Sequence, residues 1–169
     1  MALILARHTR LAVSGICYGR SDAVLAPSFA GETEALLAEL PEIARIVTSP
    51  LARCRRLADA LGDRLGLPVA ADPDLAEMDF GTWEGRPWDA IPTPELDAWA
   101  ADLLGACPHG GESVAMLLAR TRRALARLSG APGESLAVTH AGVIRAALFD
   151  AGDADAWQRE IPFARAIRL

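Results

Sequence analysis

The chain has 169 residues, of which 51% are hydrophobic, enough for a single domain over residues 1–169 with a substantial core. The net charge of −5, the lack of a basic tract and the lack of any run of roughly 18 apolar residues argue against nucleic acid or a membrane as a partner. Three widely spaced cysteines form neither a disulfide framework nor a zinc motif, and the N-terminus has no signal-peptide pattern, so we expect a reduced, cytoplasmic protein.

Residues 2–6 form the first predicted element, a short apolar run typical of a parallel strand that is buried on both faces. The run ends in Arg7, His8 and Thr9. Ligands of open α/β sheets bind where strands end at the carboxyl edge. An arginine there can bind phosphate and a neutral histidine can attack phosphorus, although a solvated strand end is the commoner reason for such residues.

Residues 11–27 contain several glycines and a proline and are predicted to be a loop that lines the site, with Tyr18 and Arg20 as candidate polar contacts. An amphipathic helix is predicted over residues 29–40, and a second strand over residues 43–48. A strand, a helix and a strand in this order are typical of an α/β fold with a parallel sheet.

A helix start follows the second strand. Ser49 is predicted as the N-cap and Pro50 as the first helical residue, and the apolar pattern continues to Leu65. Arg53 falls in the first turns, where free N–H groups and the helix dipole favour an anion rather than a cation. This mismatch indicates a phosphate-binding role for Arg53, with a solvent-exposed arginine as the alternative.

Three acidic side chains follow a short predicted strand at residues 69–71. They are Glu77, Asp79 and Glu84, within residues 75–85, a segment that also holds aromatic residues and glycines. A carboxyl group in such a setting can serve as the general acid for an organic leaving group. Composition alone does not decide which of the three has this role, and a solvated turn residue is the alternative.

The next predicted elements are a short helix over residues 96–104, a loop over residues 107–111 and a long helix over residues 112–128. We expect His109, in the loop, to be exposed, with a contact to the substrate as the alternative. The long helix has one apolar side and one side of arginines that is expected to face solvent. These arginines are Arg120, Arg122, Arg123 and Arg127.

Residues 135–139 repeat the pattern of the chain's beginning. They form an apolar strand that ends in a histidine, His140, and a predicted helix follows over residues 143–149. If the two strands are parallel neighbours, His8 and His140 meet at one edge of the sheet. A last edge strand is predicted at residues 164–169.

Four segments carry the residues named above and occur in the order LARHT, TSPLARCRRLA, LAEMDFGTWEG and VTHAGVIRA. In this order they resemble the motifs of the histidine phosphatase (phosphoglycerate mutase-like) superfamily. The resemblance implies a three-layer α/β/α sandwich with a mostly parallel central sheet. It also implies that His8 is the nucleophile that becomes phosphohistidine and that Glu77 is the proton donor. The other members of the implied phosphate pocket are Arg7, Arg53 and His140.

The implied chemistry needs no metal or cofactor. Neutral His8 attacks a small-molecule phosphomonoester, while two arginines and a protonated His140 stabilise the charge on the transferring phosphoryl group. Glu77 protonates the departing alkoxide and then takes a proton from the water that hydrolyses the phosphohistidine.

The first motif departs from the family pattern. Thr9 stands where the family usually has glycine, Leu11 stands where it usually has threonine or serine, and the usual asparagine a few residues later is missing. We therefore expect Thr9 or Ser14 to serve as an auxiliary donor to the phosphate.

Within the superfamily, the segments CYGRSD, FGTWEGRPWDAIP and GGES look most like those of α-ribazole phosphatases. That branch removes phosphate from α-ribazole 5′-phosphate in assembly of the cobalamin nucleotide loop. It implies that Tyr18, Trp83 or Trp88 stacks on the base, with packing in a core or lid as the alternative for each tryptophan. The alternative functions are a broader phosphatase on sugar phosphates or phosphohistidine proteins, a mutase, and a non-catalytic phospholigand sensor.

Overall fold

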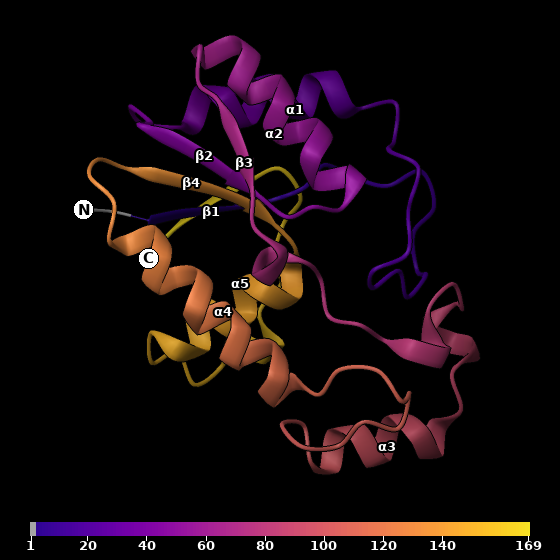
Figure 1. The fold of residues 1–169 in the computed structure, drawn as a ribbon. Coiled ribbons are helices and arrows are strands. Elements are labelled where there is room, and N and C mark those ends of the chain that lie inside the picture. Colours follow the sequence, from indigo (N-terminus) through magenta and orange to yellow (C-terminus); the bar gives the residue numbers. More distant parts are fainter. Residues whose placement is uncertain (1–2) are drawn as a thin grey trace.

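The computed structural model describes residues 3–169 and, within them, a five-stranded sheet of order β3-β2-β4-β1-β5 (Figure 1). The strands are β1 (Leu3–Arg7), β2 (Arg45–Thr48), β3 (Val69–Ala71), β4 (Ser135–Thr139) and β5 (Ala166–Arg168). The first four are parallel, and β5 runs antiparallel along β1. The predicted α/β class with a mostly parallel sheet is confirmed. Ala2, which the first predicted strand included, lies outside the described residues.

Helices cover both faces of the sheet, which makes three layers (Figure 1). Helices α1 (Phe29–Glu39) and α2 (Ala52–Leu65) lie on one face, and α4 (Val114–Ser129) and α5 (Ala141–Asp150) on the other. Helix α3 (Thr93–Ala101) lies apart from both layers. None of the helices in the described part of the chain is both long and apolar enough to cross a lipid bilayer. Four short 3-10 turns within it are η1 (Pro73–Leu75), η2 (Gly81–Trp83), η3 (Trp88–Ala90) and η4 (Ala156–Gln158).

Alternate side chains of β1 face the two helical layers. Leu3 and Leu5 pack in the core that includes α4 and α5, whereas Ile4 and Ala6 pack in the core that includes α2. The strand is therefore buried on both faces, as its uninterrupted apolar run predicts. Burial of this kind fixes the register, because a slip by one residue would reverse every side chain.

The pairing of β1 with β4 decides where the polar residues gather. Arg7 lies opposite Thr139 at the end of the parallel ladder, so the next residues, His8 and His140, leave the sheet together. The His8 N–H still donates to the Thr139 carbonyl at 3.1 Å. The two imidazole rings have centroids 5.3 Å apart, which confirms that the histidines meet at the carboxyl edge.

A third apolar group, here called the aromatic cluster, lies beside that edge. Its members are Cys17, Trp83 and Ile91, with partly buried Phe80, Trp88, Leu96 and Trp99 packed against them. The loop of residues 11–27 joins the cluster through Cys17, and its Ile16 forms a β-bridge with Pro87. The loop is thus an ordered wall between the sheet edge and the aromatic cluster.

Two predicted helix boundaries are wrong, each for a local reason. Helix α2 begins at Ala52 and not directly after Ser49, because the Ser49 hydroxyl accepts a backbone N–H in a turn that precedes the helix. Helix α3 covers Thr93–Ala101 rather than residues 96–104, because Pro94 fits the first helical turn, where its missing N–H costs nothing.

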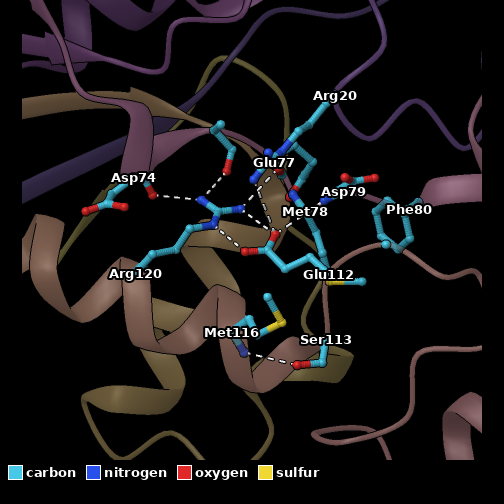
Figure 2. Close-up of polar contacts among 12 residues, drawn as sticks. Arg20, Asp74, Glu77, Met78, Asp79, Phe80, Glu112, Ser113, Met116 and Arg120 are labelled. Atoms are coloured by element: carbon cyan, nitrogen blue, oxygen red, sulfur yellow. Dashed lines mark hydrogen bonds and ion pairs between the residues drawn. The ribbon is translucent and has the colours of Figure 1, made fainter.

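Two residues predicted to face solvent are buried. His109 is 1% exposed, and its ring packs against that of Trp83 with centroids 4.8 Å apart. Arg120 is 6% exposed and reaches from α4 toward the segment around Glu77 (Figure 2). The helical period assigns Arg120 to the polar side of α4, but that part of the side meets protein rather than water. The other arginines of this side are exposed, as expected, and they are Arg122, Arg123 and Arg127.

Candidate active site

A cavity of about 220 Å³ lies at the carboxyl edge of the sheet, next to the ends of β1 and β4. It gathers polar and aromatic side chains from distant parts of the chain. Its wall includes Arg7, His8, Leu11, Ile16, Tyr18, Gly19, Arg53, Glu77, Phe80, Trp88, Ala141, Gly142 and Arg145. Arg7, His8, Arg53 and Glu77, which come from three of the four motifs, therefore share one cavity, and His140 adjoins it through the His8 ring.

The His8 ring is neutral and oriented. Its Nδ1 lies 2.7 Å from the Thr9 carbonyl oxygen, which can only accept, so Nδ1 carries the proton. Burial, together with the positive charges of Arg53 and Arg7, lowers the pKa of His8 to about 3. Nε2 forms no hydrogen bond among residues 3–169, and His8 lines the cavity. The ring therefore presents a free lone pair at neutral pH.

The His140 ring is fully buried beside it. Its Nε2 lies 2.8 Å from Ser49 Oγ and 3.3 Å from Cys54 Sγ. Burial, followed by the charge of Arg53, lowers the pKa of His140 well below its ordinary value, which favours the neutral ring while the cavity holds no anion. A negatively charged phosphoryl group beside it raises the pKa again, because an opposite charge favours the imidazolium.

Two guanidinium groups give the cavity its positive charge. Arg7 donates from Nη1 to the Ile161 carbonyl at 2.6 Å and lies 3.6 Å from the centre of the Phe163 ring. Burial lowers the pKa of Arg7 to about 10, which leaves it charged at neutral pH. Arg53 donates to two backbone carbonyls of the 11–27 loop. Within residues 3–169 neither arginine forms an ion pair with a carboxylate, so both charges remain available to an anion.

The Glu77 carboxyl group lies on the same cavity wall. Its Oε1 accepts the Met78 N–H at 2.9 Å, and its Oε2 accepts the Gly142 N–H at 3.3 Å. A Cβ atom at Gly142 would lie only 2.2 Å from Oε1, so the approach of the carboxyl group to α5 requires glycine there. The carboxyl group is held by backbone donors near the first turn of α5, on the cavity that also holds His8.

The two rival acids have structural contacts instead. Glu84 accepts hydrogen bonds from the Arg20 N–H at 2.9 Å and from the Phe80 N–H at 3.1 Å, and thereby joins the 11–27 loop to η2. Asp79 accepts the Gly81 N–H at 2.8 Å in a tight turn. Both lie outside the cavity wall, so Glu77 is the acid whose position suits proton transfer.

Tyr18 and Arg20, predicted as substrate contacts, take different positions. Tyr18 lines the cavity, and its hydroxyl donates to the Val13 carbonyl at 2.9 Å. Arg20 lies outside the wall: its Nε donates to the Glu77 carbonyl at 3.3 Å, and its Nη2 is 3.7 Å from a Glu112 oxygen. Tyr18 remains a candidate contact, while Arg20 supports the backbone of the acid.

Trp83 and Thr9 are fully buried and lie outside the cavity wall. The Trp83 indole N–H donates to Glu95 at 2.6 Å, so this tryptophan packs in the interior, and Trp88 is the one on the wall. Stacking of Trp83 on a substrate is therefore wrong for this arrangement. Thr9 Oγ1 has no hydrogen-bond partner in the described part of the chain, and its role toward phosphate stays a prediction.

Arg145 is a cavity residue that the motifs did not single out. It follows Gly142 by one helical turn on α5, and its Nε donates to the Arg159 carbonyl at 3.0 Å. The signal was present in the sequence as helical spacing, because residues three apart share a helix face. Arg145 adds a third positive charge to the wall.

Comparison of the sequence with known proteins identifies its family and several related proteins. The profile of the histidine phosphatase superfamily (branch 1) matches residues 3–165. The probable phosphoglycerate mutase GpmB of Yersinia enterocolitica is 38% identical over 87 residues, which are 49% of this chain and 40% of that protein. The glucosyl-3-phosphoglycerate phosphatase of Mycobacterium tuberculosis is 39% identical over 114 residues, 65% of this chain and 47% of that protein. The matched region is less than half the length of either relative.

Solved structures share the whole fold. The α-ribazole phosphatase from Shigella flexneri superposes with a TM-score of 0.87 at 26% identity, over 99% of this chain and 89% of that chain. A phosphoglycerate mutase from Thermus thermophilus superposes with a TM-score of 0.81 at 29% identity, over 100% of this chain and 92% of that chain. The chain therefore belongs to the histidine phosphatase superfamily, branch 1.

Proposed function

We propose that the protein hydrolyses phosphomonoesters through a phosphohistidine formed on His8. The observation that carries the proposal is the state of the His8 ring, which is neutral, held through Nδ1 and without a partner at Nε2 in the described residues. Attack on phosphorus requires such a ring. Arg7 and Arg53 on the same wall supply the positive charge that the phosphoryl oxygens need in the transition state.

The reaction divides into two displacements at phosphorus. In the first, the Nε2 lone pair of His8 bonds to phosphorus, the bond to the ester oxygen breaks, and protonated Glu77 gives its proton to that oxygen. In the second, the Glu77 carboxylate takes a proton from water, the water oxygen bonds to phosphorus, and the bond from Nε2 to phosphorus breaks. Inorganic phosphate leaves, and Glu77 is protonated again.

For the substrate we propose α-ribazole 5′-phosphate. Support comes from a second cavity, of about 430 Å³, that shares Phe80, Trp88 and Arg145 with the first. The rest of its wall is mostly apolar and includes Trp99 and Trp157. A flat aromatic base fits this wall by stacking, while its phosphate lies in the first cavity. The Shigella flexneri relative named for this activity has the same fold.

A phosphorylated glycerate, free or joined to a sugar, is the alternative substrate. Two relatives carry such compounds in their names. The observation in favour is Arg145, which lines both cavities and can bind a second anionic group such as a carboxylate. Release of inorganic phosphate distinguishes a hydrolase from a mutase, which returns the phosphoryl group to a bound substrate.

The test is a panel of phosphomonoesters compared by kcat/KM in the presence of excess chelator. The panel holds α-ribazole 5′-phosphate, 3-phosphoglycerate, glucosyl-3-phosphoglycerate and 4-nitrophenyl phosphate. We expect release of inorganic phosphate, the highest kcat/KM for α-ribazole 5′-phosphate, and no turnover by His8→Ala. Similar kcat/KM values across the panel would contradict the substrate, and full activity of His8→Ala would contradict the mechanism.

A further inference from the structure

The segment that carries Glu77 belongs to no helix or strand of the described chain. It lies between η1, which ends at Leu75, and η2, which begins at Gly81. The position of the Glu77 backbone relative to the cavity must therefore come from other contacts. Those contacts come from a buried ion pair, Arg120 with Glu112, whose closest atoms are 2.6 Å apart (Figure 2).

A guanidinium group has five N–H donors, and all five of Arg120 form hydrogen bonds in this region. Nε and Nη2 donate to the two Glu112 oxygens at 2.6 and 2.9 Å. Nη1 donates to the carbonyls of Asp74 at 2.8 Å and Ala76 at 2.6 Å. Nη2 also donates to the Glu77 carbonyl at 3.1 Å. One side chain of α4 thus fixes three carbonyls of the segment that presents the acid.

Glu112 holds the other end of the same segment. Its backbone N–H donates to the Asp79 carbonyl at 2.8 Å, and its Oε2 accepts the Asp79 N–H at 3.3 Å. Figure 2 shows Glu112 between the Arg120 guanidinium and this backbone. The ion pair and its hydrogen bonds therefore hold residues 74–79 in the way that a sheet or helix holds other segments.

We propose that the Arg120–Glu112 pair is a positioning device for the proton donor of this site. Both side chains are buried and lie outside the cavity wall, so they act on the reaction through Glu77. A buried ion pair stabilises a fold little better than apolar side chains of the same shape, whereas a fork of directional donors fixes several carbonyls at once. The proposal rests on the proposed role of Glu77 as general acid.

Substrates with different leaving groups distinguish a displaced Glu77 from a loss of folded protein. An alkoxide needs a proton as it leaves, whereas 4-nitrophenolate is stable enough to leave without one. A displaced acid therefore lowers kcat/KM for the best alkyl phosphate of the panel far more than it lowers kcat/KM for 4-nitrophenyl phosphate. The comparison uses kcat/KM because this constant ends with formation of the phosphohistidine, whereas kcat also includes the second displacement, in which Glu77 is the base for every substrate. Loss of folded protein slows both substrates equally.

Arg120→Lys and Glu112→Gln are the test variants. Lysine keeps the charge but lacks the planar fork, and glutamine keeps an acceptor oxygen but lacks the charge. For each we expect kcat/KM for the alkyl phosphate to fall by about 10- to 100-fold, the size of effect produced by a shift of ~1 Å in a catalytic group. We expect kcat/KM for 4-nitrophenyl phosphate to change little.

Arg123→Lys is the matched control. Arg123 lies one turn further along α4, is exposed, and forms an ion pair with the side chain of Asp74 at 2.9 Å. Its replacement by lysine repeats the same chemical change outside the positioning contacts. We expect the ratio of kcat/KM for the two substrates to stay at that of the unmodified protein.

Glu77→Gln is the reference, because it removes the acid itself. The proposal requires Arg120→Lys, like Glu77→Gln, to lower kcat/KM more for the alkyl phosphate than for 4-nitrophenyl phosphate. It also requires the double variant, with Arg120→Lys and Glu77→Gln together, to have a kcat/KM for the alkyl phosphate no lower than that of Glu77→Gln alone. Equal slowing of both substrates by Arg120→Lys, or none, overturns the positioning role even where Glu77→Gln discriminates. If Glu77→Gln does not discriminate, the proposed function fails and this inference with it. Should Arg120→Lys not fold, Glu112→Gln carries the same comparison.

Discussion

The two histidines of the site differ in which ring nitrogen is engaged. His8 is held through Nδ1 by the Thr9 carbonyl, whereas His140 is held through Nε2 by Ser49, with Cys54 next to the same atom. Nε2 of His8 is therefore available to bond to phosphorus, and Nε2 of His140 is not. This asymmetry supports His8 as the nucleophile and His140 as a neighbour whose protonation follows the charge in the cavity.

Gly142→Ala separates the position of the acid from the stability of the fold. The added Cβ would lie 2.2 Å from Glu77 Oε1, the end of a flexible side chain, so the carboxyl group moves and the protein still folds. Alanine is the better helix former in α5 by up to about 1 kcal/mol. We expect an unchanged or higher Tm, with kcat on an alkyl phosphate lower by on the order of 10-fold.

Gly31→Ala is the control for that substitution, because a Cβ there meets open space on α1. We expect it to leave kcat unchanged. A Gly142→Ala protein with normal kcat, measured beside this control, would show that the carboxyl group is not held where the structure places it.

At the scale of elements, the turn η2 and the residues before it contact the loop of residues 107–111 through their backbones. Gly81 has φ +48, a conformation that favours glycine. The Thr82 N–H donates to the His109 carbonyl at 2.9 Å. A Cβ at Gly111 would lie 2.3 Å from the Asp79 carbonyl oxygen. Residues 79–82 and 109–111 are therefore in contact through their main chains, which leaves no room for side chains at these glycines.

Gly81→Ala is expected to lower the free energy of unfolding by more than about 2 kcal/mol, because the left-handed backbone and a steric contact both oppose alanine. The new Cβ would lie 2.2 Å from the His109 carbonyl oxygen, which belongs to the backbone and cannot turn aside. Gly85→Ala is the control, since Gly85 has φ +79 but open space around it, so only the backbone cost of roughly 1–2 kcal/mol applies. Urea unfolding measures the free energy of unfolding of both variants. An equal decrease in the two would contradict a steric contact between the new Cβ at position 81 and the His109 carbonyl oxygen.

For the whole molecule, the features that could be predicted are those with local signals. The apolar runs that end in His8 and His140 are local, and parallel pairing of buried strands then brings the rings together. The burial of Arg120 and of His109 has no local signal in the sequence, because it depends on contacts with distant parts of the chain. A helical period assigns Arg120 to a polar face but cannot tell water from a chain segment rich in free carbonyls. The place of Arg145 on the cavity wall could have been predicted from its spacing on α5 from Gly142.

All three histidines of the chain are buried, and burial is the main cause that lowers the pKa of each, that of His8 to about 3. In the unfolded chain their pKa returns to the ordinary value of 6.5. Between these values unfolding takes up a proton on His8, so this stabilisation is present in full above pH 6.5 and is lost as the pH falls toward about 3. The lowered pKa values of His140 and His109 change the stability in the same direction. Each proton contributes a slope of about 1.4 kcal/mol per pH unit.

The free energy of unfolding, measured with urea, is therefore expected to fall between pH 7 and pH 5, with a slope that steepens toward the acid end as more of the histidines of the unfolded chain take up a proton. His109→Asn tests the assignment, because asparagine can accept the Gly111 N–H that His109 Nδ1 accepts at 3.1 Å but cannot titrate. We expect this variant to have a shallower slope than the unmodified protein, since one of the three titrating side chains is removed. Asp74 lies outside the pH window: burial opposes the change, but hydrogen bonds from Arg123 and Arg127 lower its pKa from 3.8. An unchanged slope in His109→Asn would mean that His109 titrates alike in the folded and unfolded chain, which its burial against Trp83 argues against.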